Sequence, residues 1–241
     1  MRIDSHHSFS ERYPLEYLDT ILKRNRFDAS VVVVPQAFVP VLVCPPFVRG
    51  IVVSLDLRDP QLPHLLDQYQ RDPKFKSVCH HFTAEIPEGL AELERRAIPL
   101  DALTPPALIP RIVDRFPSLR IVIDHVGQPE GGSPLARPAT GVPDLPGDQW
   151  ARDLEQASQS PQVFCKLSAI ARLAPSPRPY VQHALAVFGP RRLMFGSDWP
   201  AGLPDTTWKA SLAAFTQALG AQTIEVREEL LGGTAERFYG L

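Results

Sequence analysis

Residues that could bind a metal or activate water open the chain, whose first ten residues read MRIDSHHSFS. Side chains alternate along a β-strand, so Asp4, His6 and Ser8 would share one face there and His7 would point the opposite way. Two histidines two residues apart at a strand end would form a metal clamp, but a serine holds the second position. The stretch therefore indicates either a metal site with one ligand fewer or a different kind of site.

The elements that would position these groups are short apolar runs, rich in β-branched residues, that alternate with helical patterns. We expect eight strands, at 2–4, 30–34, 49–55, 75–79, 97–103, 119–124, 163–168 and 193–197. Alternating strands and helices predict a parallel sheet, and eight repeats predict an α/β fold of the (β/α)8 TIM-barrel type. We expect one domain over residues 1–241. An open doubly wound sheet is the alternative, but no glycine-rich turn follows the first strand.

The segment 36–48 departs from this repeat, because it is short and contains three prolines. We expect a loop or a single turn there, and thus a degenerate second βα unit. The segment 128–147 is long and rich in glycine and proline, and it follows the sixth expected strand. Long loops in compact domains often border binding sites, so we expect this one to lie on the active-site face.

In a TIM barrel the active site lies at the C-terminal ends of the strands. The polar residues expected there are His6, Ser8, Gln36, Asp56, His80, His81, Thr104, His125, Lys166, Ser168 and Asp198. Because the eighth strand closes against the first, Asp198 should lie beside His6 and Ser8. His80 and His81 are adjacent, so only one of them can face the barrel mouth.

Composition narrows the classes of partner. The chain has 241 residues and a net charge of −2, without the basic patch typical of nucleic-acid binding. It contains no apolar run of the ~20 residues needed to span a membrane. Its three cysteines are odd in number and widely spaced, which favours a reducing, cytoplasmic location over a disulfide framework. We therefore expect a small-molecule substrate, while the sequence leaves the oligomeric state open.

Four stretches, spread in order from end to end of the chain, carry a family resemblance. They are IDSHHSF, LRIVIDHVGQP, VFCKLSAI and RLMFGSDWP, the last followed by GGTAERFYGL. Together they resemble the amidohydrolase superfamily, in particular the amidohydrolase-2 type barrel hydrolases of the sugar lactonase and dicarboxylate lactonase branch. The resemblance implies a barrel that hydrolyses a lactone or related carbonyl compound, often with a divalent metal. Three positions depart from the family pattern, where Ser8 replaces a histidine, Cys79 an arginine and Ser10 a tryptophan.

The resemblance also implies roles for individual residues. Asp198 would be the general base, and the catalytic set would be Asp198, His125 and Lys166. A divalent metal such as zinc would be held by His6, His125 and Asp198, since a catalytic zinc usually has three protein ligands plus water. The replacement by Ser8 implies that this metal is weakly bound or absent. The substrate would contact His80, Ser8, Ser168 and Arg172.

Several alternatives stay open at this level. Hydrolysis could be metal-assisted, or Asp198 could take the proton from water while His6, His125 and Lys166 polarise the carbonyl. Lys166 could bind a substrate carboxylate or pair with an acid of the core. The chain could also be a ligand-binding barrel that has lost activity, or a decarboxylase of the same superfamily.

Overall fold

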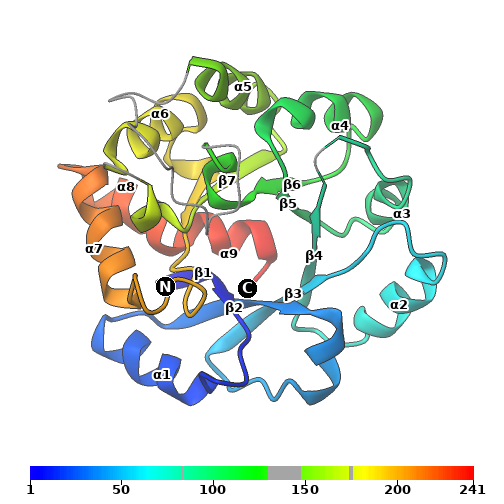
Figure 1. Cartoon of the computed structure of the whole chain (residues 1–241), viewed down its shortest axis with the longest axis horizontal. Coiled ribbons are helices and arrows are strands. Elements are labelled where there is room, and N and C mark those ends of the chain that lie inside the picture. Colours follow the sequence, from blue (N-terminus) through cyan, green and yellow to red (C-terminus); the bar gives the residue numbers. More distant parts are fainter. Residues whose placement is uncertain (83, 130–147, 174–175) are drawn as a thin grey trace.

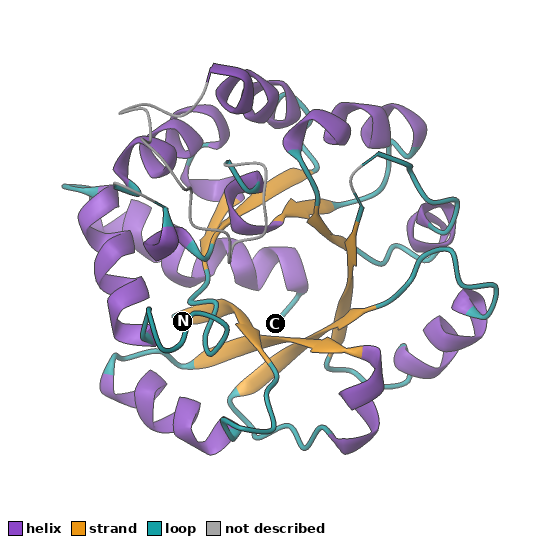
Figure 2. Ribbon diagram, in the orientation of Figure 1, coloured by secondary structure: helices purple, strands orange, loops and turns teal. Residues whose placement is uncertain are grey.

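The strands form the expected ring. The computed structural model describes residues 1–82, 84–129, 148–173 and 176–241, and in it eight parallel strands follow one another in the order β1 to β8. Their bounds are β1 Ile3–Ser8, β2 Ala29–Pro35, β3 Val48–Ser54, β4 Phe75–His81, β5 Leu100–Leu103, β6 Ile121–Ile123, β7 Val163–Leu167 and β8 Leu193–Phe195. Figure 2 shows these strands as a central ring surrounded by helices. The fold is a (β/α)8 TIM barrel, as the alternating pattern predicts.

The barrel closes between β8 and β1, which lie side by side. The Ser5 hydroxyl donates to the Phe195 carbonyl at 2.6 Å, and the Asp198 N–H donates to the His6 carbonyl at 2.8 Å. The Ser8 N–H donates to the Trp199 carbonyl, also at 2.8 Å. The expected contact between the first and eighth strands is thus confirmed.

Helices cover the outside of the ring (Figure 1). They are α1 Leu15–Arg24, α2 Leu62–Tyr69, α3 Leu90–Arg95, α4 Ile109–Arg115, α5 Asp148–Ser158, α6 Arg178–Phe188, α7 Trp208–Leu219 and α8 Ile224–Glu228, whereas α9 Thr234–Tyr239 lies across one end of the ring. The strands are apolar on both faces because each face meets a core. In β2, Val31 packs inside the barrel, whereas Val32 and Val34 pack against the helical layer. A parallel sheet buried on both sides requires such continuous apolar runs.

The second βα unit is degenerate, as its prolines predict. It contains only the 3₁₀ segment η1, Gln36–Val41, with Pro40 inside it. The loop expected at 128–147 lies outside the described residues apart from its first two positions.

The C-terminal helix α9, which the strand and helix patterns did not predict, closes the N-terminal end of the barrel. It lies across the ring in Figure 1, and its Ala235, Phe238 and Tyr239 pack with the interior strand residues. The preceding turn η6, Glu229–Gly233, comes so close to the N-terminus that a Cβ on Gly232 would lie 1.9 Å from the Met1 carbonyl oxygen. A glycine is therefore required where this segment crosses β1.

Candidate active site

Strained backbone marks the C-terminal ends of two strands. His125 and Val126, just after β6, have φ of 53° and 54°, and Asp198, just after β8, has φ of 58°. Non-glycine residues rarely adopt this left-handed conformation, and it is least favourable for a β-branched residue such as Val126. Such strain is typical of functional sites, where the surrounding structure holds side chains in a required direction.

These strand ends bring His6, His125 and Asp198 together into what we call the rim cluster. One potential ligand atom from each residue lies within 4.8 Å of the others. The imidazole rings of His6 and His125 meet edge to face, with centroids 4.7 Å apart. All three residues are buried, with exposed fractions between 4% and 9%. Segments that are far apart in the sequence thus converge at one point of the barrel mouth.

The donor set of the rim cluster fits a divalent metal such as zinc, which binds imidazole nitrogen and carboxylate oxygen. The Nδ1 atom of His125 lies 2.8 Å from the Ser168 hydroxyl, which leaves its Nε2 for the cluster. His6 Nε2 lies 3.8 Å from Asp198 Oδ1, too far for a hydrogen bond but close enough to share a ligand. A hydrogen bond to the second ring nitrogen of a ligating histidine is typical of metal centres, because it orients the ring.

Gly196 explains the glycine in the GSDWP stretch. A Cβ at this position would lie 2.6 Å from the His6 Cβ and 3.0 Å from the Ser168 Cβ. Real Cβ atoms do not approach this closely, so only glycine lets β8 pass beside His6. The close approach determines the separation between His6 and Asp198.

Lys166 lies below His6 inside the barrel and is fully buried. Its Nζ lies 2.5 Å from Asp101 Oδ2, 3.0 Å from Asp124 Oδ1 and 3.1 Å from His6 Nδ1. Burial alone would lower the pKa of Lys166, but the two carboxylates outweigh it and raise that pKa well above its ordinary value. Of the two alternatives open from sequence, the structure therefore pairs this lysine with acids of the core.

Burial and neighbouring charges also set the ionisation of the other core groups. Burial lowers the pKa of His125 to about 4, so its imidazole is neutral near pH 7. Burial opposes the charge on Asp124, but Lys166 and His6 outweigh it and keep the pKa of Asp124 well below its usual range. The site thus combines a neutral imidazole with the ion pair of Lys166 and Asp124 beneath it.

The four residues expected to contact substrate differ in their placement. Ser168 is fully buried behind His125, whereas Ser8 is half-buried at the end of β1. Arg172, at the end of the 3₁₀ turn η4 (Ile170–Arg172), places Nη2 2.7 Å from Asp198 Oδ2. His80 is buried and its Nδ1 lies 2.7 Å from the Leu55 carbonyl, whereas His81 is exposed.

His80 also borders a separate hollow of about 300 Å³, lined in addition by Arg58, His81, Phe82, Ala84, Glu85 and Pro87. Burial lowers the pKa of His80 from its ordinary value. This hollow lies at the C-terminal end of β4, on the same face of the barrel as the rim cluster.

The first strand departs from simple alternation. Its register against β2 shifts between Asp4 and His7, as a β-bulge does, so Asp4 and His6 do not share a face. The Asp4 carboxylate accepts hydrogen bonds from Trp208 Nε1 at 2.7 Å and from the Ser197 N–H at 2.8 Å. The expectation that Asp4 joins His6 and Ser8 was therefore wrong. His7 points away from the barrel axis as expected, with Nε2 3.0 Å from the Ser30 hydroxyl.

Sequence reasoning missed Asp101 and Asp124, although both left a signal. Each is a single acid within an apolar strand pattern, and a fully buried acid requires a partner. The presence of Lys166 in another buried strand supplied that partner.

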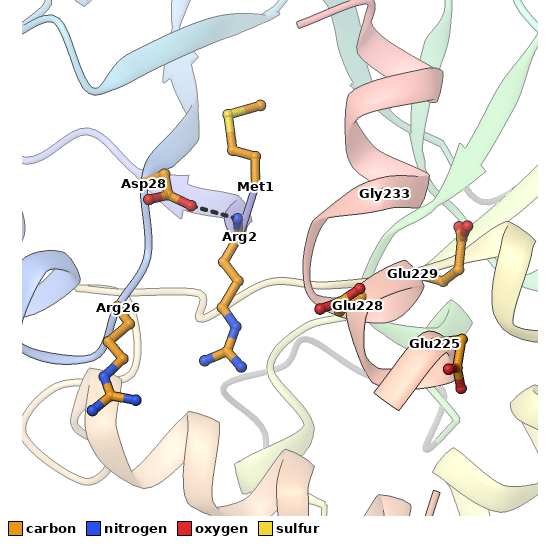
Figure 3. Close-up of a pocket in the computed structure, with 8 residues that line it drawn as sticks. All are labelled: Met1, Arg2, Arg26, Asp28, Glu225, Glu228, Glu229 and Gly233. Carbon is orange, nitrogen blue, oxygen red and sulfur yellow. Dashed lines mark hydrogen bonds between the residues drawn. The ribbon is translucent and has the colours of Figure 1, made fainter. Parts of the chain in front are cut away.

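A hollow of about 630 Å³ lies at the opposite end of the barrel (Figure 3). Arg2 and Arg26 lie on one side of it, and Glu225 and Glu228 on the other. The Asp28 carboxylate accepts a hydrogen bond from the Arg2 N–H at 2.8 Å. These residues lie at the N-terminal ends of the strands or in the C-terminal segment beside them, whereas TIM-barrel active sites lie at the strands' C-terminal ends. The hollow is therefore separate from the candidate active site.

Comparison with known proteins agrees with this geometry. The profile of the amidohydrolase family matches residues 46–241. An L-fucono-1,5-lactonase of Burkholderia ambifaria is 28% identical over 173 residues, 64% of this chain and 56% of that protein. An L-fucono-1,5-lactonase of Burkholderia multivorans is 27% identical over 221 residues, 80% of this chain and 72% of that protein.

A solved structure of the same family has the same fold. The crystal structure of an amidohydrolase from Burkholderia multivorans with bound zinc is 26% identical to this chain and superposes with a TM-score of 0.81. The match covers 100% of this chain and 99% of that chain. This chain belongs to the amidohydrolase family, and it is a hydrolase built on a TIM barrel. Within the part of the chain that the structure describes, no helix is both long and apolar enough to cross a membrane.

Proposed function

We propose that the protein hydrolyses a lactone, with Asp198 as the general base. The observation that carries this proposal is the convergence of His6, His125 and Asp198 within 4.8 Å at the barrel mouth. The two lactonase relatives support the choice of a lactone among carbonyl substrates. We also propose that residues 1–241 act as a single domain with a small-molecule substrate.

In the proposed reaction, Asp198 accepts a proton from water as the water oxygen adds to the lactone carbonyl carbon. The ion pair with Arg172 fixes Oδ2 of Asp198, so Oδ1 faces the reacting water. The ring C–O bond then breaks, and the proton passes to the leaving oxygen to give a hydroxy acid. With Nδ1 of the neutral His125 ring accepting from the Ser168 hydroxyl, its Nε2–H would donate to the carbonyl oxygen, on which negative charge develops.

A divalent metal such as zinc, held by His6, His125 and Asp198, would supply a bound water of lowered pKa and would polarise the carbonyl. The two mechanisms require different tautomers of His6. With its proton on Nδ1, facing Asp124 Oδ1 at 3.6 Å, the ring offers the Nε2 lone pair to a metal. With Nδ1 accepting from Lys166, the ring presents an Nε2–H donor to substrate.

We propose direct substrate contacts for Ser8, His80 and Arg172, which border the mouth. Lys166 and Ser168 are fully buried, so we propose that they act by holding His6 and His125. Specificity on this fold depends on the rim, which varies independently of the barrel.

The test is a panel of lactones that includes five- and six-membered sugar lactones and dicarboxylate lactones. Turnover is followed by proton release in weak buffer, for the wild type, Asp198→Asn and the control Asp56→Asn. Asp56 also lies just past a strand end and pairs with an arginine, Arg58, at 3.0 Å, but it is exposed and outside the rim cluster.

We expect Asp198→Asn to lower kcat by about 10²–10⁴-fold, the usual contribution of general acid–base catalysis. The control should retain the wild-type rate. Absence of turnover by the wild type across the panel would favour a ligand-binding barrel or another reaction of the superfamily. A loss of similar size in the control would contradict the assignment of Asp198.

A further inference from the structure

A chain of buried polar contacts runs along the barrel axis from the C-terminal helix to the rim cluster. The Tyr239 hydroxyl donates to Asp101 Oδ2 at 2.8 Å. The same oxygen accepts a hydrogen bond from Lys166 Nζ at 2.5 Å, and Nζ in turn lies 3.1 Å from His6 Nδ1. We call Tyr239, Asp101, Lys166 and His6 the axial column. It connects helix α9, at the N-terminal end of the barrel, to the residues at the opposite end.

Each member of the axial column is held in one place. Asp101 Oδ1 accepts a further hydrogen bond from the Ser77 hydroxyl at 2.6 Å, so both of its oxygens are engaged. Asp101 and Lys166 are 0% exposed and Tyr239 is 4% exposed. Polar groups this deeply buried do not exchange partners with water, so the position of each depends on the next.

Helix α9 provides a rigid base for this column. The Tyr239 ring packs against Phe238 at 4.9 Å and lies 5.7 Å from Lys166 Nζ, in the range of a cation–π contact. Burial and the Asp101 carboxylate raise the pKa of Tyr239 well above its ordinary value, so the hydroxyl keeps its proton and remains a donor.

We propose that Tyr239 is a positioning residue for the hydrolysis, fixing His6 through Asp101 and Lys166. This inference rests on the proposed function of the rim cluster. Tyr239 touches no reacting atom, because Asp101, Lys166 and His6 lie between it and Asp198. Without the tyrosine hydroxyl, Asp101 Oδ2 loses one of its two donors and keeps Lys166. The carboxylate and the ammonium bound to it can then move together, which changes the distance from Nζ to His6 Nδ1.

The variant that tests this is Tyr239→Phe, which removes the hydroxyl and keeps the ring. The matched control is Thr234→Val on the same helix, where the buried Thr234 hydroxyl donates to the Pro190 carbonyl at 3.1 Å, outside the axial column. Both variants lose one buried hydroxyl group with its hydrogen bonds, which at Thr234 also involve Glu229 Oε2 and Arg237 Nη2. A general loss of stability in α9 would therefore affect both in the same way.

We expect Tyr239→Phe to lower kcat roughly tenfold with KM within about twofold, since a 1 Å misplacement of a reacting group costs about 10²-fold and this shift is smaller. Thr234→Val should leave both constants unchanged. Asp101→Asn with Tyr239→Phe should be no slower than Asp101→Asn alone, because residues acting through one partner are not additive. Additive losses, or equal losses in Thr234→Val, would overturn the proposal.

A second readout needs no substrate. The ¹⁵N resonances of the His6 ring, assigned by comparison with His6→Asn, should move in Tyr239→Phe and stay in place in Thr234→Val. Unmoved His6 resonances in Tyr239→Phe would overturn the positioning role even if the rate changed. If the wild type hydrolyses no lactone, the proposed function fails, while these resonances still decide whether Tyr239 positions His6.

Discussion

Replacing Lys166 with methionine should destabilise the protein far more than the same replacement at the surface. Met matches the unbranched lysine stem but leaves Asp101 and Asp124 without their cation, and both carboxylates are at most 1% exposed. Removing one partner from a buried ion pair costs about 3–5 kcal/mol, because the remaining charge cannot be solvated. With two carboxylates affected, we expect the upper part of that range. Such a loss is a large share of the ~5–15 kcal/mol by which domains are usually stable.

The control is Lys23→Met on helix α1. Lys23 Nζ lies 2.7 Å from Asp19 Oδ2, a separation between those of the two Lys166 ion pairs, but its side chain is 74% exposed. An exposed pair four residues apart on a helix contributes about 0.3–0.5 kcal/mol. The two substitutions exchange the same side chains, but Lys166 is buried between two carboxylates and Lys23 is exposed beside one. We therefore expect the loss in the free energy of unfolding to be roughly tenfold larger for Lys166→Met.

The measurement is urea unfolding followed by tryptophan fluorescence and far-UV circular dichroism. The double variant Asp101→Asn with Lys166→Met should be more stable than Lys166→Met alone, because one uncompensated charge is removed. A loss below about 1 kcal/mol in Lys166→Met, or no recovery in the double variant, would refute the reasoning that charge pairing in the core governs this site.

Two further predictions concern the rim cluster. Gly196→Ala should lower kcat, because the new Cβ would meet the His6 Cβ at 2.6 Å and displace that residue. Gly220→Ala is the control in steady-state kinetics. Its φ of 69° makes alanine strained, but nothing lies within 4 Å of the new Cβ, so it controls for general destabilisation and kcat should fall only at Gly196. Ser8→His should raise metal occupancy, measured by elemental analysis after dialysis against a mild chelator, because an added imidazole supplies one more ligand. Tight, full occupancy of the wild type would contradict the expected weak binding.

Most strands and helices of the barrel could be predicted from the local hydrophobic pattern of the sequence. The eight apolar runs are all strands, with ends shifted by a few residues, because a parallel sheet buried on both faces leaves a continuous apolar signature. The helical patterns between these runs correspond to the helices that cover the ring. Because TIM-barrel active sites lie at the C-terminal ends of the strands, the strand positions alone predict His6, His125 and Asp198 at one rim. Helix α9 escaped prediction because it is only six residues long, too short for a clear periodic pattern.

The sequence by itself therefore determined the barrel, the family and the three residues of the rim cluster. Only the tertiary structure decided how they are held. It showed that a bulge turns Asp4 toward Trp208, that Lys166 pairs with Asp101 and Asp124, and that the Tyr239 hydroxyl donates to Asp101. Periodicity and strand order depend on neighbouring residues along the chain, so a sequence displays them. Ion pairs and hydrogen bonds between elements join residues up to 204 positions apart, and they depend on register and side-chain direction, which appear only when the chain is folded.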